Sequence, residues 1–251
     1  MIKINNYING EFHPVKHFLE DLNPATGEVI AKIPKSGLNE VEKAVNAADE
    51  ARTLWSSTSL EERTDWLHKI ADALEARSDE IASLESLDTG KPIALARAVD
   101  ASRSVANFRF FAQFAKDFTV EDFEMDDAMN HVILKPVGIA GLITPWNLPL
   151  YLLSWKIAPA IVMGNTVVAK PSELTPLTAN LLSEVIDEID LPAGVVNIVH
   201  GLGSEAGQFI VENSKVNLIS FTGGTTTGKM VAATAAPMFK KLSLELGGKN
   251  A

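Results

Sequence analysis

The carboxylate of Glu245 is a candidate general base. Glu245 stands in the stretch LSLELGG, in which leucines at 242, 244 and 246 alternate with polar residues. This alternation predicts a strand with one apolar and one polar face, and the two glycines after it permit a tight turn or a close backbone approach. Glu245 is therefore a candidate base beside a turn. A solvated carboxylate on a polar strand face has the same pattern.

Two glycine-rich loops form a second group of candidates. HGLGSEAG and TGGTTTG each precede a helical pattern, and their glycines are Gly201, Gly203, Gly207, Gly223, Gly224 and Gly228. Glycines at a loop-to-helix junction let backbone N–H groups approach a pyrophosphate. Neither loop has the strict spacing G-x-G-x-x-G, and ordinary turn glycines give a similar pattern.

These loops follow strands in a regular order. Five apolar runs end in TPWNLP, KPSE, HGLGSEAG, TGGTTTG and ELGG, with helical patterns between them at 150–163, 175–189, 204–213 and 225–236. Strand and helix alternating in this way predict parallel βαβ units. Right-handed crossovers then give an α/β fold with a doubly wound, Rossmann-like parallel sheet. Ligands bind such sheets at the carboxyl ends of the strands, where all five loops would meet.

The first half of the chain has a different pattern of predicted secondary structure. Residues 1–36 are β-like, with an Asn-Gly hairpin signal in YINGEF, and residues 39–118 have the spacing of four helices. Ser59 and Glu62 have the spacing of a capping box at the start of the second helix. From about residue 131, NHVILKPVGIAGLITPWN predicts strands interrupted by Pro136.

Composition excludes several classes of function. The net charge is −10 and the pI about 5.0, which argue against nucleic acid or an anionic membrane as partner. No apolar run predicts a membrane span and the N-terminus has no leader pattern, so we expect a cytoplasmic protein. The scattered histidines predict no metal site. The sequence has no cysteine, which excludes thiolate ligands and thiol nucleophiles within these residues.

Long motifs together resemble the aldehyde dehydrogenase superfamily. They are GLITPWNLPLYLLSWKIAPAIVMGNTVVAKPSE, FTGGTTTG, LSLELGGKNA, YINGEF, NPATGEVIA and DTGKP. The resemblance implies a dinucleotide-binding domain, here 1–119 and 138–251, and part of a β oligomerisation arm at 120–137. It also implies a catalytic domain, which is absent here, and a homo-oligomer. The family's nucleophile is a cysteine beyond the LELGG motif. We therefore expect a fragment, the N-terminal half, that is inactive alone.

The resemblance also assigns roles to individual residues. Asn147 matches the amide that stabilises the oxyanion, and Glu245 matches the base that activates water; a turn asparagine and a surface carboxylate are the alternatives. The residues expected to bind NAD are Ile143, Thr144, Pro145, Trp146, Lys170, Ser172, Glu173, Gly203, Gly207, Gly223, Gly224 and Gly228.

Several residues carry a further expectation. Lys170 and Glu173 match the residues that hold the adenosine ribose, and a carboxylate there favours NAD over NADP. Ser172 and Glu173 could in addition cap the next helix. Gly224 departs from the family pattern, in which a serine often contacts the pyrophosphate. Lys156 resembles a family lysine near the active site, although a lysine extending from its helix to solvent fits equally well.

Arg103 suggests a substrate class. It shares an apolar helical stripe with Val99, Ala106 and Phe110, so we expect it to be enclosed and to need an anion. Relatives that oxidise 2-amino- or 2-hydroxymuconic semialdehyde carry an arginine here, which implies an aldehyde substrate with a carboxylate. The alternative is an internal ion pair with Asp100 or another acid. Arg109 is expected to be a structural partner.

Three classes of function remain open from the sequence. The first is a fragment of an NAD-dependent enzyme that oxidises an aldehyde or semialdehyde. The second is a stand-alone NAD-binding module without catalysis. The third is an interaction module that joins full-length relatives through the arm.

Overall fold

A seven-stranded sheet forms the centre of the molecule. The computed structural model describes residues 1–248; residues 249–251, the last three of the motif LSLELGGKNA, lie outside that range. The strand order is β12-β11-β8-β9-β10-β2-β3. The strands of this sheet are β2 (Asn6–Ile8), β3 (Glu11–His13), β8 (Ile139–Ile143), β9 (Thr166–Lys170), β10 (Val196–Ile198), β11 (Val216–Thr222) and β12 (Lys241–Glu245).

The order of the parallel strands confirms the doubly wound fold. β8 lies between β9 and β11, and all pairings from β12 to β10 are parallel. The chain first runs outward from β8 through β9 to β10, and then crosses back to β11 and β12 on the other side. The strand order therefore reverses between β8 and β11, and this reversal is where such sheets bind ligands.

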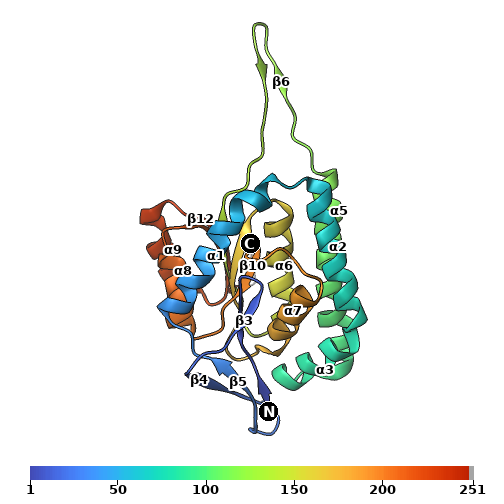
Figure 1. Cartoon of the computed structure of the whole chain (residues 1–251), viewed down its shortest axis with the longest axis vertical. Coiled ribbons are helices and arrows are strands. Elements are labelled where there is room, and N and C mark those ends of the chain that lie inside the picture. Colours follow the sequence, from blue (N-terminus) through green and yellow to red (C-terminus); the bar gives the residue numbers. More distant parts are fainter. Residues whose placement is uncertain (249–251) are drawn as a thin grey trace.

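Helices cover both faces of this sheet (Figure 1). On one face lie α1 (Leu38–Ser57), α8 (Gln208–Glu212) and α9 (Thr225–Ala235), and on the other α2 (Leu60–Ala76), α5 (Ser102–Asp117), α6 (Pro149–Val162) and α7 (Leu177–Glu188). Successive strand residues point to opposite faces. In β8, Ile139 and Ile143 pack with the first group, whereas Ala140 and Leu142 pack with the second.

The N-terminal residues form the expected hairpin. β2 and β3 pair antiparallel across Asn9 and Gly10, whose φ values of 55° and 77° place both in the left-handed region. Asn-Gly suits this turn because neither residue is strained there. A separate three-stranded sheet has the order β1-β5-β4. Its strands are β1 (Ile2–Lys3), β4 (Phe18–Leu22) and β5 (Val29–Pro34).

The fourth predicted helix contains a change of pitch. After α3 (Ser78–Thr89) the chain forms α4 (Ile93–Leu95), then the π-helix η1 (Ala96–Ala101), and then α5. A π turn adds a residue to one helical turn and shifts the register of the faces that follow. Residues before and after η1 therefore do not share a face at ordinary helical spacing.

The segment at 120–137 projects from the body as a long hairpin (Figure 1). It carries two short strands, β6 (Phe123–Glu124) and β7 (Met129–Asn130). The sequence predicted a strand across residues 131–135, and this prediction is wrong because no strand occurs there. An oligomerisation role for the hairpin stays a prediction. Within residues 1–248, no helix is both long and apolar enough to cross a bilayer.

Candidate active site

The candidate site lies where the strand order reverses. The ends of β8 and β11 are side by side, with Ile143 paired to Phe221. The loop after β8 begins at Thr144, whose N–H donates to the carbonyl of Lys170 at 3.2 Å. The loops that carry the predicted residues therefore start from one edge, as the sequence predicts.

Asn147 and Glu245 line one open cavity of about 800 Å³. Asn147 comes from the loop between β8 and α6, and Glu245 is the last residue of β12. Both are exposed, and Trp146 beside them is 57% exposed. The cavity is lined by Pro145, Trp146, Asn147, Leu148, Leu152, Trp155, Lys156, Thr222, Gly223, Gly224, Glu245, Leu246 and Gly247. The fold thus brings together the two residues assigned to catalysis from opposite ends of the second half.

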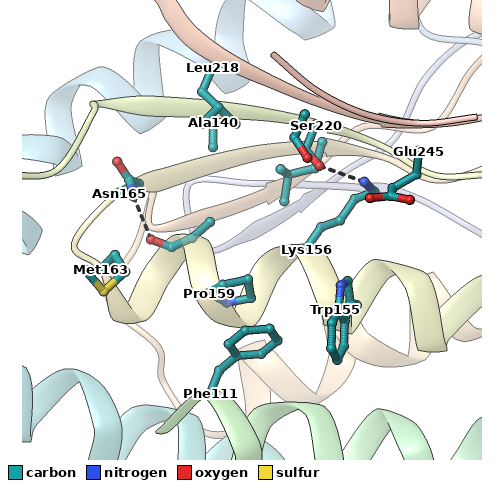
Figure 2. Close-up of a pocket in the computed structure, with 13 residues that line it drawn as sticks. Phe111, Ala140, Trp155, Lys156, Pro159, Met163, Asn165, Leu218, Ser220 and Glu245 are labelled. Carbon is teal, nitrogen blue, oxygen red and sulfur yellow. Dashed lines mark hydrogen bonds between the residues drawn. The ribbon is translucent and has the colours of Figure 1, made fainter. Parts of the chain in front are cut away.

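Lys156 points from α6 toward the sheet and not toward solvent (Figure 2). Its side chain is buried, and its Nζ donates to the Ser220 hydroxyl at 2.7 Å. Burial lowers the pKa of Lys156 to about 8, and the negative charge of Glu245 opposes that shift. Figure 2 shows the Glu245 carboxylate beside this amine. A lysine extended to solvent is therefore the wrong interpretation of Lys156.

A second cavity of about 290 Å³ lies across the end of β8, between α8 and α9. Glu173 is part of its lining and pairs with Lys170, whose Nζ lies 2.6 Å from Oε2. Burial alone raises the pKa of Glu173, but the buried Lys170 cation outweighs it and holds that pKa below its usual value. Glu173 is thus a fixed, ionised acceptor at the cavity wall. The other lining residues are Ile143, Gly203, Ser204, Gly207, Gln208, Val211, Phe221, Thr227, Met230 and Val231.

The predicted glycines divide into two groups. A Cβ on Gly203 or Gly224 would meet open space, and one on Gly207 would make only ordinary contacts with Lys170 and Ile143. These glycines leave backbone open at the helix starts, since Gly203 begins η2 (Gly203–Gly207) and Gly224 caps α9. The other two are packed, because a Cβ would come within 2.5 Å of Phe221 at Gly223 and of Leu246 at Gly228.

Ser172 and Glu173 do not cap the next helix. The Ser172 hydroxyl accepts from the N–H of Leu174 at 3.2 Å, which closes a local turn. α7 begins only at Leu177, whose N–H donates to Asp88 at 2.9 Å. The alternative helix-capping role is therefore wrong, and the cap comes from α3 instead.

The enclosed position expected for Arg103 is wrong. Arg103, Ala106 and Phe110 do share a stripe, but all three are exposed in the described part of the chain. η1 ends directly before α5, so Val99 does not continue that stripe in register. The alternative pairing with Asp100 is also absent, because Asp100 lies 2.8 Å from Lys91. Arg109 pairs with Asp72 and Glu75, which agrees with its expected structural role.

Sequence reasoning missed three residues at the site. Ser220 holds Lys156, and its position as a polar residue between the buried Ile219 and Phe221 is the available signal. Glu85 accepts from the N–H of Leu150 at the start of α6, at 3.1 Å. Lys91 reaches the main chain at Asn147. Lys91 lies in DTGKP, a motif that pointed to the family without a role for the residue.

Comparison with known proteins identifies the family of this architecture. Residues 12–251 match the model of the aldehyde dehydrogenase family. The chain is 50% identical to a human 2-aminomuconic semialdehyde dehydrogenase, covering 100% of the chain and 52% of the relative. It is 47% identical to a 2-hydroxymuconic semialdehyde dehydrogenase of Pseudomonas sp. (strain CF600), covering 100% and 54%.

A solved structure has the same fold. It is a Pseudomonas syringae aldehyde dehydrogenase C variant in complex with NAD⁺ and octanal, with a TM-score of 0.91 and 36% identity, covering 98% of this chain and 50% of that one. The chain spans about half the length of the curated relatives it matches. By its sequence and by the arrangement of its strands and loops, this chain belongs to the aldehyde dehydrogenase family.

Proposed function

We propose that this chain is the cofactor-binding half of an NAD-dependent aldehyde dehydrogenase that oxidises a semialdehyde to a carboxylic acid. One observation carries the proposal. Asn147 and Glu245 line one cavity, and Glu173, which pairs with Lys170, lines a second cavity at the ends of β8 and β11. A polar donor and an acid therefore meet next to a second cavity at the carboxyl ends of the strands, where sheets of this kind bind nucleotides.

Asn147 supplies a neutral hydrogen-bond donor. Its side chain is exposed to the larger cavity, in a loop bounded by Pro145 and Pro149. An amide in this position can stabilise an aldehyde oxygen as negative charge develops on it. Removing one such donor costs about 2.7–4 kcal/mol of transition-state stabilisation.

Glu245 supplies the base. A carboxylate that lines the cavity can take a proton from a water molecule that attacks the oxidised carbon. Lys156 lies beside it and holds its amine on Ser220. With a pKa of about 8, Lys156 is mostly charged at neutral pH, and the negative charge of Glu245 opposes the lowering of that pKa by burial.

The residues at the smaller cavity fit a dinucleotide. Gly203 at the start of η2 and Gly207 at its end leave backbone free of side chains, and the hydroxyl of Thr144, directly after β8, is buried without a partner among the described residues. The Glu173 carboxylate at the cavity wall would accept a hydrogen bond from a ribose hydroxyl and repel a 2′-phosphate. NAD⁺ bound at these residues would supply the hydride acceptor for oxidation of the substrate carbon.

The substrate class and the missing nucleophile complete the proposal. Arg103 offers an exposed cation for a substrate carboxylate, and the names of the relatives specify semialdehydes that carry one. A cysteine nucleophile must come from residues other than these 251, because the sequence contains none. We propose that the chain alone does not oxidise aldehydes, and that the hairpin at 120–137 joins subunits of a homo-oligomer.

Isothermal titration of the chain with NAD⁺ and NADP⁺ tests the cofactor assignment. We expect NAD⁺ to bind at least about tenfold more tightly than NADP⁺, a difference of about 1.4 kcal/mol. Glu173→Gln should reduce this preference, because a neutral side chain no longer repels a 2′-phosphate. Glu42→Gln, an exposed change on α1, is the matched control. Absence of heat with both dinucleotides, or a preference for NADP⁺, contradicts the proposal.

A further inference from the structure

We propose that Lys91 is a positioning residue for Asn147. The inference rests on the proposed function, in which the Asn147 amide stabilises negative charge on the substrate. Lys91 does not line the cavity that Asn147 faces. It acts on the main chain of Asn147 from behind the loop.

Lys91 connects two acids to the loop. Its Nζ lies 2.8 Å from Asp100 Oδ1 and 3.8 Å from Glu85 Oε2. The same Nζ donates to the main-chain carbonyl of Asn147 at 3.3 Å. The side chains of Glu85 and Asp100 are 0% and 1% exposed, and that of Lys91 is 13% exposed. Their geometry is thus set by one another and not by solvent.

The loop depends on such external anchors. Pro145 and Pro149 have no N–H, so the loop has fewer backbone donors than usual for hydrogen bonds within itself. Its carbonyls are held from outside instead. The Trp146 carbonyl accepts from the Thr175 hydroxyl at 3.3 Å, and the next carbonyl along, that of Asn147, accepts from Lys91.

Glu85 links these anchors to the helix that follows. Its Oε1 accepts from the N–H of Leu150 at 3.1 Å and from the Thr178 hydroxyl at 2.8 Å, while its Oε2 faces Lys91. One carboxylate therefore holds both the start of α6 and the cation that holds Asn147. The loop is fixed on either side of the functional amide.

The side chain of Asn147 makes this backbone anchor important. Within residues 1–248, no hydrogen bond holds the Asn147 side-chain amide, so its direction follows the backbone. The π-helix η1 adds a second observation, because its penultimate residue is the buried Asp100. A π turn next to a buried acid is a costly local feature, and such turns cluster at functional sites.

A charge-balanced variant tests the role of Lys91 without leaving a buried charge unpaired. Lys91→Met/Asp100→Asn removes the cation together with its nearest anion. The matched control is Arg97→Met/Asp79→Asn, which removes a 2.9 Å ion pair whose side chains are 55% and 87% exposed. Both are compared with the unsubstituted 251-residue chain by ¹⁵N NMR relaxation at pH 6, where Glu85 is mostly protonated.

The Leu148 amide, which shares a peptide group with the Asn147 carbonyl, is the reporter. In the unsubstituted chain and the control we expect a rigid amide with an order parameter of about 0.85. In Lys91→Met/Asp100→Asn the order parameter of the Leu148 amide should fall below about 0.6, and its ¹⁵N resonance should move. The amides of β8 and β9 should keep their order parameters and resonances. A rigid and unshifted Leu148 in this variant overturns the inference. So does an equal loss in the control.

A parallel NAD⁺ titration keeps this inference separate from the proposed function. If the unsubstituted chain does not bind NAD⁺, the cofactor assignment fails, and the NMR comparison still decides whether Lys91 fixes the Asn147 loop.

Discussion

Glu85 makes the stability of the chain depend on pH. It is fully buried in α3, where burial raises its pKa from the usual 4.5 to about 7. Hydrogen bonds from Leu150 and Thr178 favour the charged form, the charge of Asp100 opposes it, and Lys91 favours it. We predict that Glu85→Gln removes this pH dependence, because Gln keeps an oxygen that accepts the same two hydrogen bonds.

The sign follows from the raised pKa. A carboxyl with a higher pKa in the folded chain binds its proton more tightly there, so its contribution is fully present below pH 4.5 and is lost as the pH rises through about 7. Relative to its value at low pH, the contribution of Glu85 to the unfolding free energy is smaller by about 0.8 kcal/mol at pH 5 and by about 3.3 kcal/mol at pH 8. Between these two pH values Glu85 should therefore cost the chain about 2.5 kcal/mol.

Urea unfolding from pH 5 to pH 8 measures this difference. The unfolding free energy of Glu85→Gln relative to the unsubstituted chain should rise by about 2.5 kcal/mol across the range, equivalent to about 5–10 °C in Tm. Glu85→Gln also loses the pairing with Lys91. This loss changes the relative unfolding free energy by a nearly constant amount and adds little to its dependence on pH. Glu42→Gln should show no such rise. A flat difference for Glu85→Gln would refute the assignment of a raised pKa to this side chain.

Three other predictions follow from packing and exposure. Gly194→Ala should destabilise the chain by about 1–3 kcal/mol in urea unfolding, because Gly194 has φ +80° and a Cβ would lie 2.5 Å from the Ala47 carbonyl oxygen. Gly27→Ala, with φ +73° and open space around it, should cost less, and equal costs would show that the clash is unimportant. Trp55→Phe should cost about 1–3 kcal/mol, because its buried Nε1 donates to Ile161 at 3.0 Å; an unchanged Tm would contradict this. Phe123 and Ile133 are 58% and 73% exposed on the projecting hairpin, so Phe123→Ser/Ile133→Ser should lower the molar mass measured by light scattering. A chain already monomeric before substitution would contradict that last prediction.

The sheet was predictable because each of its strands carries a local pattern. Apolar runs that end in glycine or proline located β8 to β12, and the helical spacing between them gave the crossovers. Ser59 was also located correctly, since its hydroxyl accepts from the N–H of Glu62. Residues 131–135 are apolar enough for a strand but lie in a projecting hairpin, where they have no strand partner.

The site was predictable only as far as its loops. Asn147 follows β8 and Glu245 ends β12, and these two parallel strands flank β11, so topology brings both residues to the same edge of the sheet. The prediction for Arg103 failed because the stripe that it shares with Ala106 and Phe110 is exposed, and an apolar stripe in a sequence does not show whether another element covers it. The role of Glu85 was not predictable either. It depends on contacts between Glu85, Leu150 and Thr178, which lie far apart in the sequence and meet only in the folded chain.

The most direct test of the central claim is a crystal structure of the chain with NAD⁺. The account predicts the adenosine half between α8 and α9, with Glu173 at the ribose hydroxyls. It predicts the nicotinamide half in the cavity that Asn147 and Glu245 line. NAD⁺ bound away from the β8 and β11 ends, or bound there with Glu173 turned away from the ribose, would contradict it.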